Sequence, residues 1–277
     1  MAVLLVHCGA HSTEAVADGA EAALAEGLRT LRSGGDALAA VVAAVTVLED
    51  DDRMNAGTGS RLNLAGEAEM DASVMDSRGR AGAVAALRDV KNPILVAREV
   101  LGSDHLLLAG EGALRFAREA GFPPYDPRTD RAREELGRVV ARLNPAPEEG
   151  PSLPPGAGDT VGAVARDESG YMAAANSTGG ISVQLPGRVG DTPVIGAGIY
   201  AGPHGAVTAT GIGEEIMRRV LSKWVYDRLA EGGDPETTCE EGVAQYAESV
   251  PVGLLAVSPT GFGAAANTRM AWRSGRI

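Results

Sequence analysis

An abrupt change of composition at Thr160 constrains the fold of this chain more than any other feature. Residues 144–158 are rich in Pro and Gly, carry two Glu and contain little that is apolar, so we expect a flexible linker there. Directly after it, Val161, Ala163 and Ala165 begin an apolar strand. With 277 residues and 44% hydrophobic content the chain can build a substantial core, and no other internal boundary is visible.

Hydrophobic periodicity and capping residues predict the elements on each side of the linker. Apolar residues between Ser12 and Ser33 recur with a helical period that stops at Gly34-Gly35, and Asp36 is suited to cap a second helix through Leu48. Further expected helices cover 93–101, 110–120, 130–143, 213–231 and 235–249, and expected strands cover 2–6, 69–75, 81–87, 160–166, 171–175, 206–210, 253–258 and 262–267. This order suits an α+β fold of two stacked sheets with helices on both outer faces, a four-layer αββα sandwich.

Charge and composition exclude several classes of function. The net charge of −12, with no clustered Lys or Arg, argues against nucleic acid as a partner. No stretch approaches the roughly 20 apolar residues of a membrane span, and the apolar start lacks the basic flank of a signal peptide. Cys8 and Cys239 are too few for a disulfide framework. We therefore expect a cytoplasmic protein that binds neither membrane nor nucleic acid.

Thr160 would acquire a distinctive chemistry if the bond after Asp159 were cut. The new terminal residue would carry a hydroxyl and a free α-amino group on adjacent carbons, which is a nucleophile with its own base. An α-amino group has an unperturbed pKa near ~8, so an appreciable fraction is unprotonated at neutral pH. The alternative is that Thr160 is a β-branched residue that opens a strand.

Five further motifs accompany Thr160. They are Asn-Ala-Gly-Thr-Gly at 55–59, Met-Asp-Ala-Ser-Val-Met-Asp at 70–76, Asn-Ser-Thr-Gly-Gly at 176–180, Leu-Pro-Gly-Arg-Val-Gly-Asp-Thr-Pro at 185–193 and Thr-Ala-Thr-Gly-Ile-Gly-Glu at 208–214. In this order they resemble the N-terminal-nucleophile (Ntn) hydrolases of the plant-type L-asparaginase and isoaspartyl peptidase family, which also contains glycosylasparaginase. The resemblance covers nearly the whole chain outside the linker. It implies a single αββα domain, 1–277, that cleaves itself between Asp159 and Thr160 into 1–159 and 160–277.

The resemblance also implies roles for particular residues. Thr160 would be nucleophile and base, Thr178 would hydrogen-bond its hydroxyl, and Asn55 would support it from the other fragment. Thr210 and the backbone N–H of Gly211 would form the oxyanion hole. The alternative for that segment is an ordinary turn from strand to helix, although its glycines would let the backbone approach a ligand closely.

A substrate clamp is expected from the Gly- and Pro-rich loop that contains Arg188 and Asp191. In the family the matching pair holds the α-carboxylate and α-ammonium of an aspartyl substrate, beside Gly211 and Gly213. Arg suits the first task because its planar fork meets a carboxylate through two parallel hydrogen bonds. A local salt bridge between the two side chains is the alternative.

The resemblance offers one metal, a structural sodium ion, and catalysis would need no cofactor. Its ligands would be the backbone carbonyls of Leu48, Glu49, Asp51, Met54, Ala56 and Thr58. The acidic run at 49–52 does not form a calcium hand, because Met54 and Ala56 stand where oxygen-bearing side chains are needed. His7, Cys8 and His11 are more typical of packing residues than of a metal site.

The sequence departs from the family pattern in two places. The start is His7-Cys8-Gly9-Ala10, where the family usually has a second Gly, and Asp159 before Thr160 looks more like the glycosylasparaginase branch. The favoured hypothesis is a self-cleaving enzyme, with a homodimer of cleaved units implied by the resemblance, that hydrolyses L-asparagine and β-aspartyl (isoaspartyl) dipeptides. Glycosylasparaginase activity is the first alternative, and an uncleaved, non-catalytic relative is another. Nucleotide binding at 196–201 is disfavoured, because no helix is expected to open at Gly198.

Overall fold

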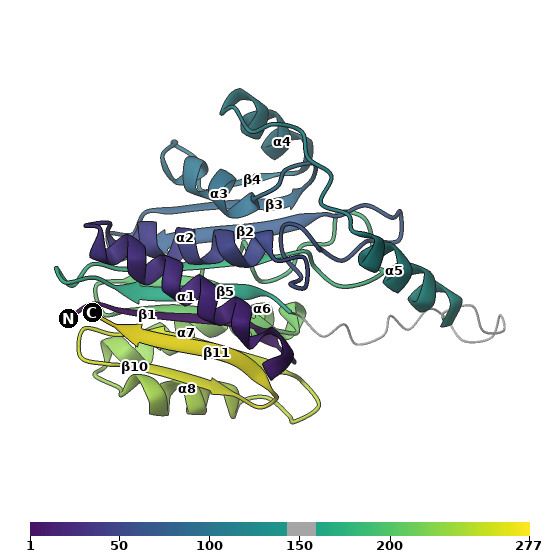
Figure 1. Cartoon of the computed structure of the whole chain (residues 1–277). Coiled ribbons are helices and arrows are strands. Elements are labelled where there is room, and N and C mark those ends of the chain that lie inside the picture. The colour runs from purple at the N-terminus through teal and green to yellow at the C-terminus, as the bar shows by residue number, and fades with distance from the viewer. Residues whose placement is uncertain (143–158) are drawn as a thin grey trace.

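The structure, a computed structural model, describes residues 1–142 and 159–277 (Figure 1). The expected linker, 144–158, lies outside the described residues. Within the described ranges the chain forms eight α-helices and two β-sheets, so the predicted α+β class is confirmed. No helix in the described part of the chain is long and apolar enough to cross a membrane.

The larger sheet has seven strands in the order β11-β1-β5-β6-β2-β3-β4. Their bounds are β1 Val3–Ala10, β2 Met70–Asp76, β3 Ala81–Leu87, β4 Leu107–Ala109, β5 Val161–Arg166, β6 Met172–Thr178 and β11 Met270–Arg276. Strand β1 pairs antiparallel with both β5 and β11, and β6 pairs with both β5 and β2. Strands from before and after Thr160 therefore alternate through the middle of this sheet.

The smaller sheet has four strands, in the order β10-β9-β8-β7, and packs face to face with the first. Its strands are β7 Ile199–Gly202, β8 Gly205–Gly211, β9 Val252–Val257 and β10 Phe262–Ala266. Buried side chains from both sheets, among them Leu5, Val164, Ile199 and Leu255, share one apolar cluster. That cluster is the layer of core between the two sheets.

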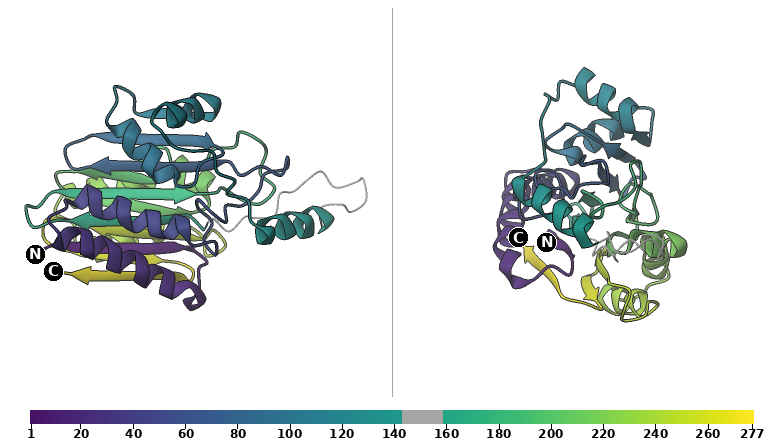
Figure 2. Two further views of the ribbon diagram at one scale, coloured as in Figure 1. Left: turned by 45° about the horizontal axis from the view of Figure 1, so that its top comes forward. Right: turned by 90° about the vertical axis from the view of Figure 1, so that its right-hand side faces the viewer.

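Helices cover the two outer faces, which confirms the four-layer αββα arrangement. On the larger sheet lie α1 Ala17–Arg32, α2 Ala37–Asp50, α3 Pro93–Leu101 and α4 Gly110–Glu119. On the smaller sheet lie α7 Leu221–Ala230 and α8 Pro235–Val243, preceded by the short α6 Gly213–Arg219. The right-hand view of Figure 2 shows the purple and the light green helices on opposite sides of the sheets. Helix α5 Asp130–Arg142 projects beyond one end of the sheets (Figure 1).

Most predicted elements agree with the structure, and a few differ. Asp36 caps α2 as expected, with its carboxylate accepting from the N–H of Ala39 at 2.8 Å. The helix expected over 213–231 is instead two helices, because Val220 adopts a left-handed conformation with φ 50°. Strands β4, β7 and β11 were not predicted.

Candidate active site

Thr160 lies directly before β5 and is buried, with 3% of its surface exposed. Val161 pairs with Ser177 across β6, so continuing the register by one residue places Thr160 opposite Thr178. On its other side β5 pairs with β1, where His7 faces Gly162, and the same continuation leads to Gly9. Thr160 is thus held between two strands at the edge of the paired region, where a hydroxyl can face a ligand.

Gly9 is packed against the backbone of Asp159, immediately before the predicted cleavage point. It adopts φ +101°, and a Cβ atom there would lie 2.5 Å from the Cα and 2.6 Å from the carbonyl carbon of Asp159. A side chain at position 9 would displace that carbonyl. Ala10, the next residue, is fully buried and donates its N–H to the Thr210 hydroxyl at 3.1 Å.

Thr178 and Asn55 meet around the turn that follows β6. The Thr178 hydroxyl accepts from the N–H of Gly180 at 3.1 Å, and the Asn55 side chain donates to the carbonyl of the same Gly180 at 2.7 Å. The Asn55 carbonyl accepts from the N–H of Gly179 at 2.8 Å. The loop at 55–59 and the segment at 176–180, far apart in sequence, therefore support one another beside Thr160.

Thr210 and Gly211 end strand β8 of the smaller sheet, and the hydrogen bond from Ala10 brings Thr210 to the larger one. Gly211 adopts φ +145°, and a Cβ atom there would overlap the carbonyl oxygen of Pro251. Only glycine fits this close approach. The predicted oxyanion donors therefore sit on rigid strand backbone rather than on a free loop.

Arg188 makes a contact that the sequence analysis did not predict. Its Nε and Nη2 donate to the two carboxylate oxygens of Glu214, both at 2.9 Å, in a bidentate pair. The side chain of Arg188 is 15% exposed and that of Glu214 46% exposed. Arg188 thus pairs with Glu214 rather than with Asp191, and its fork already holds a carboxylate. A cavity of about 430 Å³ lies beside this pair.

Asp191 is buried next to Arg188, with 3% of its surface exposed. Among the described residues its Oδ2 has no hydrogen-bond partner. Burial raises the pKa of Asp191 to about 7, against the opposing effect of the Arg188 charge. A Cβ atom at Gly213 would lie 2.9 Å from Asp191 Oδ1 and 3.0 Å from Arg188 Nη2, so the glycine keeps open the space that both side chains face. An unpaired buried acceptor beside a guanidinium is suited to a ligand that carries an ammonium and a carboxylate.

His7 belongs to a buried network that joins the two sheets. Its Nε2 lies 3.3 Å from the Thr208 hydroxyl, which donates to the Asn176 side-chain oxygen. The Asn176 amide in turn donates to the carbonyls of Gly198 at 2.8 Å and Ala209 at 3.0 Å. Burial lowers the pKa of His7 to about 3, so the ring is neutral. Its interpretation as a packing residue fits these contacts.

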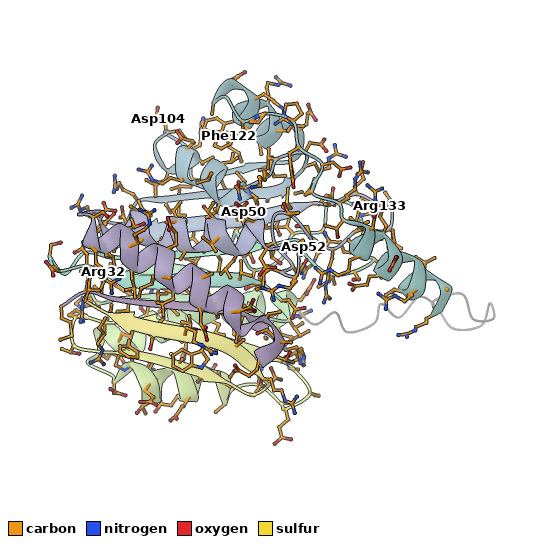
Figure 3. The ribbon with its side chains drawn as sticks, viewed as in Figure 1. Arg32, Asp50, Asp52, Asp104, Phe122 and Arg133 are labelled. Carbon is orange, nitrogen blue, oxygen red and sulfur yellow. The ribbon has the colours of Figure 1, made fainter. Side chains whose placement is uncertain are left out.

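The loop predicted to bind sodium folds back on the end of α2. The carbonyl of Glu49 accepts from the N–H of Thr58 at 2.8 Å, and a Cβ at Gly59 would lie 2.8 Å from the Met54 carbonyl oxygen. Figure 3 shows Asp52 on the side of this loop that faces α5, and Arg131 of α5 donates to the Asp52 carbonyl. The carbonyl of Asp51 likewise accepts from the N–H of Met54 at 2.9 Å. No cluster of three or more His, Cys, Asp or Glu suited to a metal occurs in the described ranges.

Comparison with known proteins finds one family model and several relatives that match nearly the whole chain. The sequence pattern of the family described as asparaginase matches residues 2–275. The plant-type L-asparaginase of Pyrococcus furiosus is 40% identical over 295 aligned residues, which cover 97% of this chain and 94% of that protein. The isoaspartyl peptidase/L-asparaginase of Danio rerio is 40% identical over 98% of this chain and 91% of its own length. The mouse protein of the same name is 39% identical over 94% of this chain.

Proposed function

Because this chain belongs to the asparaginase family of plant-type L-asparaginases and isoaspartyl peptidases, we propose that it hydrolyses L-asparagine and β-aspartyl dipeptides. The chain is an amidohydrolase. The proposed nucleophile is Thr160. It is buried between Gly9 and Thr178 directly before β5, and the peptide bond that it would attack is the one that precedes it. The names of the relatives do not favour glycosylasparaginase activity.

Maturation would begin with attack of the Thr160 hydroxyl on the carbonyl carbon of Asp159. The C–N bond breaks as the ester bond forms, and the amide nitrogen, which keeps its own hydrogen, takes up the hydroxyl proton and becomes the new α-amino group. Water then hydrolyses the ester, which leaves a carboxylate on Asp159 and a free Thr160. The products are the fragments 1–159 and 160–277.

Substrate hydrolysis would follow the same chemistry in two steps. The α-amino group of Thr160 takes the hydroxyl proton while the oxygen attacks the side-chain carbonyl carbon of the substrate. Thr210 and the N–H of Gly211 stabilise the oxyanion, and the ammonium returns its proton to the leaving amine. Water then attacks the β-aspartyl ester, and aspartate leaves. Thr178, linked to Asn55 through Gly180, fixes the position of the nucleophile's hydroxyl.

Arg188 and Asp191 would select the aspartyl half of the substrate. The α-carboxylate would bind the guanidinium of Arg188, sharing it with or displacing Glu214, and the α-ammonium would pair with the buried Oδ2 of Asp191. Both charges of the substrate would then be neutralised in a site with little water. The leaving group is not involved in this clamp.

A panel of substrates tests the proposed function. We expect β-aspartyl-leucine to be hydrolysed at least as efficiently as L-asparagine, with little action on glutamine, whose extra methylene misplaces the scissile carbonyl. The α-linked aspartyl-leucine should not be hydrolysed. The values of kcat/KM for these compounds and for a glycosylated asparagine decide the matter, because preference for the last would establish the glycosylasparaginase alternative.

The pH dependence of KM tests the assignment of Asp191. Its pKa is raised to about 7, so below that pH the free enzyme gains a proton and loses the negative charge that attracts the substrate ammonium. We therefore expect KM for L-asparagine to rise as pH falls, by roughly tenfold per unit well below pH 7. Steady-state kinetics from pH 5 to 8.5 would measure this. A KM that stays constant through pH 6 would remove Asp191 from the clamp.

We further propose three properties that the family resemblance supports. The loop with Leu48, Glu49, Asp51, Met54, Ala56 and Thr58 would bind a structural sodium ion through backbone carbonyls, which would fix the position of Asn55. The enzyme would act as a homodimer of cleaved units. A cytoplasmic location is supported by the two buried cysteines, Cys8 and Cys239, neither of which forms a disulfide within the described residues.

A further inference from the structure

Arg61 forms an ion pair with the residue that precedes the nucleophile. Its Nη2 donates to Oδ2 of Asp159 at 2.7 Å, and both side chains are largely withdrawn from water, with 19% and 25% of their surfaces exposed. The backbone of Arg61 is also fixed, because its N–H donates to the side-chain oxygen of Asn55 at 2.9 Å. The backbone of Arg61 is therefore anchored to the loop that supports the site, and its guanidinium contacts the residue directly before Thr160.

Asp159 also lines a cavity of about 180 Å³ that extends past Asn55 to His11 and Ser12. If the proposed function is correct, cleavage detaches Asp159 from β5, and nothing covalent then holds its carboxylate on Arg61. The backbone of Arg61 keeps its place, because its hydrogen bond to Asn55 lies within the same fragment. The position on the guanidinium that the Asp159 carboxylate occupies can then be taken by the carboxylate of another molecule.

The substrates differ in how many carboxylates they bring to this region. Asparagine has one free carboxylate, and its leaving group is ammonia. A β-aspartyl dipeptide has a second, on the amino acid that leaves. The two guanidiniums have different surroundings, since Arg188 contacts Glu214 whereas Arg61 contacts Asp159 and lies 3.8 Å from Glu135 of α5. Arg188 would bind the aspartyl half of the substrate. Arg61 lies next to the Asp159–Thr160 bond, because its guanidinium contacts Asp159.

We propose that Arg61 binds the free carboxylate of the leaving amino acid and so favours β-aspartyl dipeptides over asparagine. This inference rests on the proposed function and adds the identity of the group that recognises the leaving half. The Asp159 carboxylate occupies that position before maturation and holds the cleavage junction in place. Arginine suits both partners because its charge is permanent and its fork matches a carboxylate.

The test compares β-aspartyl-leucine with β-aspartyl-leucinamide, in which the leaving group has lost its carboxylate. We expect the fully cleaved enzyme to prefer the acid over the amide by about tenfold in kcat/KM, as befits one charge-assisted hydrogen-bonded contact. In Arg61→Gln the ratio should fall to near one. Arg29→Gln, which removes the same charge from an exposed pair on α1, should keep the ratio of the original enzyme.

The ratio is measured on one protein sample, so incomplete self-cleavage of a variant does not affect it. Should Arg61→Gln remain uncut, Arg61→Lys retains a charge without the fork and should lower the ratio about threefold. Equal rates on acid and amide in the original enzyme, or a preference that persists in both Arg61 variants, would overturn the assignment. A fully cleaved enzyme that hydrolyses neither compound would instead contradict the proposed function.

Discussion

Replacing Thr160 with Ala should yield one intact, folded and inactive chain. The substitution removes the only oxygen that can attack the Asp159 carbonyl from position 160, and it removes the nucleophile for substrate as well. Thr160 precedes strand β5, and the pairing of Val161 and the following residues with β6 is between backbones. Loss of the Thr160 hydroxyl and methyl should therefore leave that pairing unchanged. We expect hydrolysis of L-asparagine to fall by at least about 10⁴-fold.

Intact mass under denaturing conditions distinguishes one chain from two, and N-terminal sequencing of the second fragment identifies the cut. Thr160→Ser is the matched control, since it keeps the hydroxyl and the α-amino group and should still be cleaved. A new terminus at any residue other than Thr160, or cleavage that continues in Thr160→Ala, would refute the assignment of the nucleophile.

Thr210→Val should lower kcat by roughly a hundredfold, because a lost oxyanion donor costs about 3 kcal/mol in the transition state. Valine keeps the shape of threonine, and Thr210 is fully buried at the end of β8, so the strand should persist. The variant also leaves the N–H of Ala10 without the hydroxyl that accepts from it, at a cost of about 1–3 kcal/mol in the free energy of unfolding.

Kinetics on cleaved protein separate these two effects, because the lost oxyanion contact lowers kcat with little change in KM. Thr46→Val provides the control, since its hydroxyl donates to the Val42 carbonyl within α2, and kcat should not change. A Thr210→Val enzyme whose kcat equals that of the original would eliminate Thr210 from the oxyanion hole, whatever its thermal stability.

Local signals predicted the elements that local interactions determine. The helix at 93–101 and the strand at 81–87 have the predicted bounds, because proline begins the first and apolar residues fill the second. Strand β11 carries Arg and Ser at half-exposed and exposed positions, and its extended form depends on pairing with β1 at the other end of the sequence, from Ala10 with Met270 to Val3 with Arg276. The left-handed conformation of Val220, which divides the helix expected over 213–231, was likewise not predicted from the local sequence.

In the candidate site, too, some residues could be predicted from local motifs, whereas their long-range partners could not. Thr160, Thr178 and Thr210 could be proposed from motifs, and the structure brings all three to neighbouring strands of the two sheets. Glu214 and Arg61 were missed as partners, because a charged residue in sequence does not say which opposite charge it meets. The spacing of Glu214, four residues after Thr210 in the first turn of a helix, was the signal available for it.

The alternation of strands in the larger sheet affects whether the protein could refold after the proposed cleavage. Strand β1 of the first fragment lies between β5 and β11 of the second, and β5 and β6 lie between β1 and β2. If the chain is cut after Asp159 as proposed, its two fragments are interlaced and cannot separate while the sheet exists. Once unfolded, however, they are two molecules that must find each other by diffusion, so recovery depends on concentration. The proposed cleavage would thus commit the protein to the fold it already has, and folding as a single chain would happen only once.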